Sequence, residues 1–177
     1  MTIHPTAVVD ASATLADGVE IGPFCTVGPG VALASGVRLV SHVVIQQDTS
    51  VGANTTIHPF AVIGGDPQHN GYKGEPVRLE IGANNLIREH CTFNRGTPPH
   101  AGVGSGVTRV GSNNLFMTGA HVGHDCVVGD NVVMANNATL GGHARIGDKV
   151  FLGGLCAVHQ NGRVGQGAIV EIGRAHV

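Results

Sequence analysis

The chain has 177 residues, of which 12% are charged and 42% hydrophobic, and its formal net charge is −2. This is the size of one ordinary domain. The small net charge gives no electrostatic reason to expect a nucleic acid or an anionic membrane as partner. No apolar stretch is long enough for a transmembrane segment. With 28 Gly, 5 Phe, 1 Tyr and no Trp, the core is expected to consist of small and aliphatic side chains rather than aromatic ones.

An aliphatic residue recurs every six positions from 3 to 63 without a slip. The same phase returns over 81–93, shifts by one residue, and then continues every six positions over 110–170. A small residue stands four places after most of these, and the place before it favours Gly, Asn or Asp, which tolerate a left-handed backbone. Six is the period of neither a helix nor an alternating strand. The pattern therefore predicts a short strand and a turn, repeated along the chain.

This pattern resembles the hexapeptide repeat of the left-handed parallel β-helix, one of the solenoid repeats. The resemblance implies an all-β fold in which three hexads form one triangular coil of eighteen residues. It also implies the left-handed winding, which runs against the usual right-handed preference of crossovers. Successive coils would stack at the strand spacing of roughly 4.8 Å. We expect one β-helix domain over residues 1–170.

Two loops interrupt the repeat, at about 64–80 and 96–109. Ile63 and Ile81 are eighteen residues apart, so we expect the first loop to replace sides of a coil without altering the phase. This loop contains the only tyrosine, Tyr72, and one of the two lysines, Lys73. Long loops on a rigid scaffold often carry function, and we expect this one to do so.

All four cysteines occupy the small inward position of the repeat: Cys25, Cys91, Cys126 and Cys156. We interpret them as buried small hydrophobes, because no metal-type spacing is present. Free thiols fit a reducing compartment, so we expect a cytoplasmic protein.

Counting in coils of eighteen residues places four histidines on one narrow strip of surface: His121, His124, His143 and His159. The same count puts Gly142 one coil beyond His124, Gln160 one coil beyond Gly142, and His143 one coil beyond Asp125. A neutral imidazole is the natural general base at pH 7, and an adjacent Asp could orient it. No serine elbow, P-loop or Rossmann fingerprint is present, so a group of the substrate would attack directly. Metal binding is the competing interpretation of the histidines.

Specific motifs indicate which enzyme family has this arrangement. The run His121-Val-Gly-His-Asp, with residues 126–130, 135–143, 157–160, 63–65, 74–82 and 94–97, resembles the acyl-ACP–UDP-N-acetylglucosamine O-acyltransferase family of lipid A biosynthesis (ACP, acyl carrier protein). The resemblance covers residues 1–170. It implies transfer of a 3-hydroxyacyl group from ACP to the sugar 3-hydroxyl, without a covalent intermediate, a cofactor or a metal. It also implies a homotrimer with active sites between neighbouring β-helices.

The resemblance also assigns roles to residues. His124 matches the general base, Asp125 the residue that orients it, and Gly142 the backbone N–H donor to the thioester oxyanion. Further residues match the substrate-binding pocket or the loop that meets donor and sugar: Gln68, Tyr72, His121, His143, His159 and Gln160.

Three features depart from the family pattern. Asn94 stands where the family often has His, which leaves open a changed sugar or phosphate contact. The first loop has His69-Asn-Gly before Tyr72 where many members have an Asp and a Lys, and we expect Lys73 to compensate. Residues 171–177 break the repeat where the family continues into further coils and an ACP-binding helical domain. We expect this heptapeptide to be non-native, the natural protein to be longer, and the 177-residue chain to form weaker trimers and turn over poorly.

Other functions remain open. A zinc-dependent γ-type carbonic anhydrase shares the coil and uses His at subunit boundaries. A purely structural solenoid or a catalytically inactive binding module would need no base. Within the enzymes, a sugar N-acyltransferase, or an acceptor with an amine at the 3-position, is the nearer alternative.

Overall fold

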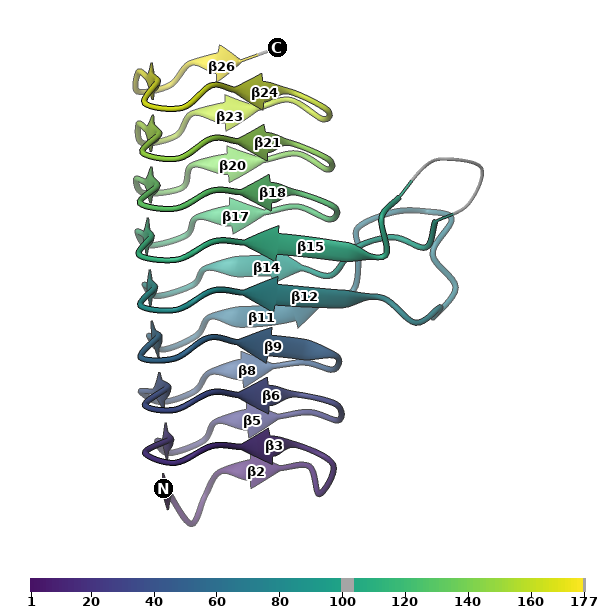
Figure 1. The fold of residues 1–177 in the computed structure, drawn as a ribbon, viewed down its shortest axis with the longest axis vertical. Helices are drawn as coiled ribbons and strands as arrows, with labels where there is room; N and C mark the ends of the chain where they lie inside the picture. Colours follow the sequence, from purple (N-terminus) through teal and green to yellow (C-terminus); the bar gives the residue numbers. More distant parts are fainter. Residues whose placement is uncertain (100–103, 177) are drawn as a thin grey trace.

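The structure, a computed structural model, describes residues 1–99 and 104–176. Over these ranges the chain winds into a stack of coils whose three sides form three parallel sheets of nine, nine and eight strands (Figure 1). The first sheet consists of β1 (Thr2–Ile3), β4 (Glu20–Ile21), β7 (Arg38–Leu39), β10 (Thr56–Ile57), β13 (Leu86–Ile87), β16 (Leu115–Phe116), β19 (Val133–Met134), β22 (Phe151–Leu152) and β25 (Ile169–Val170).

The second sheet consists of β2 (Val8–Val9), β5 (Thr26–Val27), β8 (Val44–Ile45), β11 (Val62–Gly65), β14 (Thr92–Asn94), β17 (His121–Val122), β20 (Thr139–Leu140), β23 (Ala157–Val158) and β26 (Ala175–His176). The third sheet consists of β3 (Thr14–Leu15), β6 (Ala32–Leu33), β9 (Thr49–Val51), β12 (Arg78–Ile81), β15 (Val107–Val110), β18 (Val127–Val128), β21 (Arg145–Ile146) and β24 (Arg163–Val164). Each strand is followed in sequence by a strand of the next sheet. As the chain rises in Figure 1, the near strands of the third sheet run to the left and the far strands of the second sheet run to the right, which is left-handed winding. The predicted left-handed parallel β-helix is thus confirmed.

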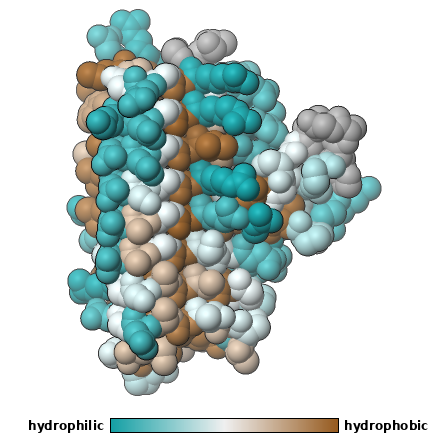
Figure 2. All heavy atoms as spheres, in the orientation of Figure 1, coloured by the Kyte–Doolittle hydropathy of each residue, from teal (hydrophilic) through white to brown (hydrophobic). Residues whose placement is uncertain are grey.

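The repeat follows from which side chain of each short strand points inward. The aliphatic residue is buried, as in Ile21, Ile57 and Leu152, while the residue before it faces outward. Residues one coil apart pair in register, so identical positions stack along the axis. Figure 2 shows the result as stripes of hydrophobic and hydrophilic side chains that run along the helix.

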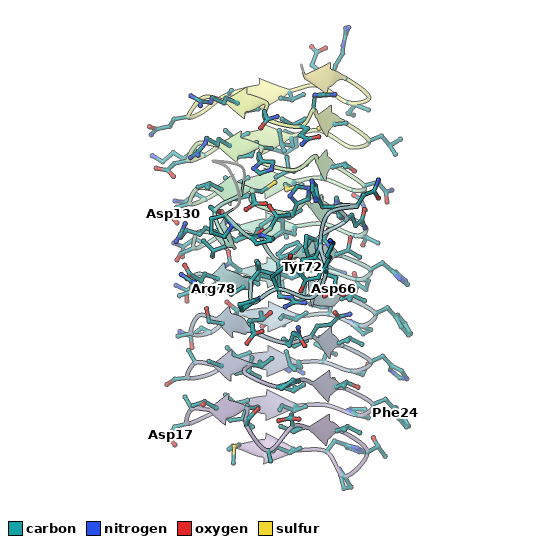
Figure 3. All side chains as sticks on the ribbon, turned by 90° about the vertical axis from the view of Figure 1, so that its right-hand side faces the viewer. Asp17, Phe24, Asp66, Tyr72, Arg78 and Asp130 are labelled. Carbon is teal, nitrogen blue, oxygen red and sulfur yellow. The ribbon has the colours of Figure 1, made fainter. Side chains whose placement is uncertain are left out.

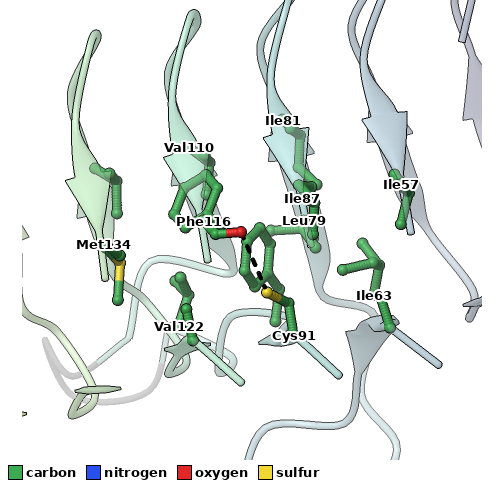
Figure 4. Packing of buried hydrophobic residues seen from close by; sticks show 14 of the residues in the cluster. Ile57, Ile63, Leu79, Ile81, Ile87, Cys91, Val110, Phe116, Val122 and Met134 are labelled. Atoms are coloured by element: carbon green, nitrogen blue, oxygen red, sulfur yellow. Dashed lines mark hydrogen bonds between the residues drawn. The ribbon is translucent and has the colours of Figure 1, made fainter. Parts of the chain in front are cut away.

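The core is less purely aliphatic than we expected. Phe93 and Phe116 are fully buried inside the coils and meet edge to face, with ring centroids 4.8 Å apart. Figure 4 shows Phe116 among Ile, Leu and Val side chains, with the Cys91 thiol hydrogen-bonded to the Phe116 carbonyl. All four cysteines are buried and free. Burial raises the pKa of Cys91 to about 11 and that of Cys126 to about 12, so neither thiol is activated.

The turn positions have the predicted left-handed backbone. Asn84 and Asn131 have φ of 56° and 57°, and Asp125 and His143, at the corner between the second and third sheets, have φ of 59° and 62°. Asn and Asp tolerate this conformation better than other side chains except glycine. The corners thus define where side chains such as Asp125 leave the coil.

The two loops are insertions at one corner, and the expected replacement of coil sides is wrong. β11 and β12 are consecutive sides, because Val51 of the coil below pairs directly with Ile81. The first loop therefore covers residues 66–77 and adds two hexads to one corner, which preserves the phase. The second loop lies between β14 and β15 at the same corner of the next coil, and it is one residue short of two hexads, which accounts for the slip. Residues 100–103 of this loop lie outside the described residues.

Within the described part of the chain, no helix has the length and apolar character needed to cross a membrane.

Candidate active site

Both loops project from the corner between the second and third sheets, immediately below the corner that carries Asp125 and His143 (Figure 1). The His143 N–H donates to the His124 carbonyl at 2.8 Å, and the Asn161 N–H donates to the Gly142 carbonyl at 2.9 Å. The strands on this side pair at a spacing of eighteen residues, His121 with Thr139 and Thr139 with Ala157. Gly142 therefore lies one coil above His124, and His143 one coil above Asp125, as the count of eighteen residues predicts.

His124 and Asp125 form a buried pair. Their exposed fractions are 7% and 6%, and His124 Nδ1 lies 2.9 Å from Asp125 Oδ2. A carboxylate only accepts hydrogen bonds, so Nδ1 carries the hydrogen and Nε2 of the neutral ring keeps its lone pair. Nε2 is thus the atom that can accept a proton.

The second loop holds the Asp125 carboxylate in place. Thr97 donates its backbone N–H (2.9 Å) and its hydroxyl (2.6 Å) to Oδ2, and Ser105 donates its N–H (2.8 Å) and its hydroxyl (3.1 Å) to Oδ1. Burial alone would raise the pKa of Asp125, but the bonds from His124, Ser105 and Thr97 outweigh it and hold this pKa well below its ordinary value. Asp125 therefore stays ionised at neutral pH.

Gly142 borders the proton-accepting edge of the imidazole. A Cβ atom on Gly142 would stand 2.5 Å from His124 Nε2, closer than any real carbon can approach. Among the described residues, no protein acceptor takes a hydrogen bond from the Gly142 N–H. Gly142, with its free N–H, and the proton-accepting Nε2 therefore lie side by side, which suits a reaction that moves a proton and develops negative charge on oxygen.

Two further predicted histidines flank the pair. The His143 ring centroid is 5.0 Å from that of His124, at right angles to it, and His121 Nδ1 lies 2.8 Å from the Thr92 hydroxyl. Burial lowers the pKa of both His121 and His143, and the charge of Asp125 only partly opposes this at His143. Both rings therefore stay neutral at pH 7 and place no positive charge beside the base.

His69 joins this cluster from the first loop, which our sequence analysis did not predict. Its ring lies edge-on to His124 with centroids 5.7 Å apart. The only sequence signal was its place beside Gln68 in a loop expected to be functional. Periodicity could not locate His69, because the loop has no repeat.

The other predicted site residues are less closely tied to the pair. Gln68, His159 and Gln160 are exposed, and His159 Nδ1 contacts the Gln160 carbonyl at 3.1 Å. Lys73 is exposed, and its backbone N–H donates to Glu75 at 2.7 Å. Tyr72 is half-buried and donates its hydroxyl to the Glu75 carbonyl at 3.2 Å.

Asn94 connects the first loop to the coil. Its Nδ2 donates to the Asp66 carbonyl at 2.7 Å. Its Oδ1 is buried without a partner among the described residues, a rare arrangement for a polar atom inside a folded protein.

Arg95, also missed from the sequence, clamps the first loop. Its side chain is fully buried. The guanidinium donates to the Gly64 carbonyl (3.0 Å) and the Val77 carbonyl (3.3 Å) at the two ends of the loop, and to the Tyr72 hydroxyl (3.4 Å) within it. It also forms an ion pair with Asp66. One buried cation thus fixes the shape of the loop that places His69 against His124.

Removing Asp66, the exposed partner of Arg95 that lies on the loop itself, should loosen the loop. Figure 3 shows Asp66 and Tyr72 together on the projecting loop, with Asp17 on a lower coil. Because Tyr72 is the only tyrosine and the chain has no tryptophan, intrinsic fluorescence reports on this loop alone. We expect Asp66→Asn to increase quenching of Tyr72 by acrylamide, and Asp17→Asn to leave it unchanged. The change in unfolding free energy should be only about 1 kcal/mol or less, because the Asp66 side chain is largely exposed. Equal quenching in both variants would contradict the clamp.

A metal is the rival occupant of the cluster. Ligand atoms of His124, Asp125 and His143 all lie within 4.8 Å of one another. However, Asp125 already accepts five hydrogen bonds or contacts from Thr97, Ser105 and His124. A metal would have to displace these donors, so the donor set fits a proton-transfer pair better than a metal centre.

Comparisons with known proteins identify the family. The family model for the bacterial transferase hexapeptide (six repeats) matches residues 107–142. Proteins from Azorhizobium caulinodans and Rhizobium johnstonii, both named acyl-(acyl-carrier-protein)–UDP-N-acetylglucosamine O-acyltransferase, are 56% and 51% identical over 128 and 168 residues. These matches cover 72% and 95% of this chain but only 46% and 60% of those relatives, so the chain spans about half the length of the curated relatives it matches.

A solved structure matches this chain over its whole length. The UDP-N-acetylglucosamine O-acyltransferase of Moraxella catarrhalis superposes with a TM-score of 0.95 at 45% identity, over 100% of this chain and 67% of that one. Fold, motifs and identity agree, and the chain belongs to the acyl-ACP–UDP-N-acetylglucosamine O-acyltransferase family.

Proposed function

We propose that the protein transfers a 3-hydroxyacyl group from ACP to the 3-hydroxyl of UDP-N-acetylglucosamine, the first step of lipid A biosynthesis. The observation that carries this proposal is the buried His124–Asp125 pair, whose Nε2 borders Gly142, a residue whose N–H has no acceptor among the described residues. The names of the family's members supply the substrates.

In the proposed reaction His124 Nε2 takes the proton of the sugar hydroxyl as its oxygen attacks the thioester carbon. Asp125 stabilises the resulting imidazolium through Nδ1. The carbonyl oxygen becomes an oxyanion, which the Gly142 N–H stabilises. The C–S bond then breaks, and the thiolate leaves with the proton from His124. No covalent enzyme intermediate is needed, because the sugar oxygen is itself the nucleophile.

The remaining site residues surround this centre. In the proposal His121, His143, His159 and Gln160 line the sugar-nucleotide and acyl pocket. The first loop brings Gln68 and Tyr72, with Lys73 and Asn94 as further contacts. The protein would act as a cytoplasmic homotrimer, with each site completed by a neighbouring β-helix.

Mass spectrometry of the reaction products tests this function. Purified protein is incubated with UDP-N-acetylglucosamine, or with the analogue bearing a 3-amine, and a panel of acyl-ACPs. We expect an ester of one 3-hydroxyacyl group with the hydroxyl sugar. An amide formed only with the amine analogue would instead show a 3-amino acceptor. Stoichiometric zinc together with chelator-sensitive hydration of CO2 would favour the carbonic anhydrase alternative.

A further inference from the structure

The outward face of the third sheet carries a column of arginines beside the site. Arg109, Val127, Arg145 and Arg163 stand in register on β15, β18, β21 and β24. This sheet faces the viewer in Figure 2, which shows a column of hydrophilic side chains interrupted by one hydrophobic side chain. All three arginines are exposed.

The upper two arginines form a like-charged pair. Two other in-register pairs of charged residues join opposite charges, with ion-pair distances of 3.4 Å and 3.2 Å: Glu20 with Arg38, and Glu80 with Arg109. Among the in-register strand pairs of the described chain, Arg145 with Arg163 is the like-charged exception. Like charges directly opposite on neighbouring strands, roughly 4.8 Å apart, destabilise a sheet. An anion bound between them would reverse this effect.

A hollow is present at the same place. A pocket of about 290 Å³ is lined by the three arginines together with His143, Asn161 and Asp125. Arg145 is close enough to His143 for its charge to act on the imidazole. The negative charge of Asp125 does not exclude an anion here, because donors from Thr97, Ser105 and His124 already surround its carboxylate. The hollow therefore extends from the exposed arginines of the third sheet to Asp125 of the His124–Asp125 pair.

We propose that this hollow is an anion-binding site in which Arg145 and Arg163 hold the diphosphate of a nucleoside diphosphate. The planar guanidinium binds phosphate oxygens in a bidentate manner, and two arginines on neighbouring rungs match two linked phosphates. The anion site itself follows from the charges and the hollow. Only its assignment to a nucleotide rests on the proposed acyl transfer to a nucleotide sugar.

Calorimetric titration with inorganic pyrophosphate tests the site without any turnover. We expect Arg145→Gln and Arg163→Gln each to weaken binding roughly tenfold or more, as the loss of a charge-assisted hydrogen bond would. Arg38→Gln, which removes an exposed arginine from the first sheet, is the control and should bind like the parent protein. Equal affinity in all variants, or no binding to the parent protein, would overturn the site.

A charge reversal tests whether Arg145 and Arg163 repel each other. Arg145→Glu places a negative charge in register with Arg163, as Glu20 lies in register with Arg38. We expect a higher Tm without ligand and loss of the pyrophosphate-induced rise in Tm. A lower Tm without ligand would contradict the repulsion between Arg145 and Arg163.

Binding of UDP and of pantetheine 4′-phosphate shows which kind of molecule supplies the phosphate groups. We expect the Arg145-dependent affinity to appear with UDP. If it appears with pantetheine 4′-phosphate alone, the nucleotide assignment is wrong while the anion site stands. Because these are binding measurements, an inactive protein that still binds pyrophosphate would refute the proposed function and leave the anion site intact.

Discussion

His124→Gln is expected to lower the rate of acyl transfer by a factor of about 10²–10⁴, the range of a lost general base. A glutamine side chain can still hydrogen-bond to Asp125, but it has no nitrogen that accepts a proton at neutral pH. The fold should persist, because the corner is held by backbone bonds such as that from His143 to the carbonyl of residue 124. Initial rates with saturating sugar nucleotide, together with Tm, measure both effects.

The control for this variant is His4→Gln. His4 is exposed near the N-terminus and contacts Thr6, far along the helix from both loops. We expect it to retain the parent rate. If the His124→Gln protein is folded and transfers acyl groups at the parent rate, His124 and Asp125 do not transfer the proton.

Gly142→Ala should have an effect of similar size through the same imidazole. The new methyl group would stand 2.5 Å from His124 Nε2 and 2.6 Å from Cε1, so the ring must leave the position in which Nδ1 contacts Asp125 and Nε2 lies beside Gly142. Displacing a reacting group by about 1 Å can cost a factor of about 10² in rate. We expect at least this loss in the rate of transfer, measured beside Gly154→Ala.

Gly154 provides a matched control because it occupies the same place of the hexad two sides further on. A Cβ there meets only the Asn136 carbonyl, at 3.5 Å, which is ordinary contact. Combining Gly142→Ala with His124→Gln adds a second check. If the methyl acts by moving the base, the double variant should be hardly slower than His124→Gln alone. Additive losses would show that the methyl acts elsewhere, for example on the oxyanion donor.

The position of each loop illustrates where reasoning from spacing fails. The eighteen residues between Ile63 and Ile81 suggested that coil sides were replaced, yet Val51 pairs with Ile81 and the loop is an insertion. Both arrangements keep the hydrophobic phase, since each changes the chain by a multiple of six. Only the pairing of the strands distinguishes them.

The amino-acid sequence by itself determined the β-helix, its inward aliphatic column and the stacking of Gly142 on His124. Each of these follows from a short repeat in which a slip of register would expose the core. The tertiary structure alone decided that Thr97 and Ser105 bind Asp125, that Arg95 is buried beneath the first loop, and that His69 reaches His124. These contacts join loops of irregular sequence to residues up to 55 positions away. Their geometry depends on side-chain hydrogen bonds that compete with water, and no periodic pattern specifies which partner is chosen.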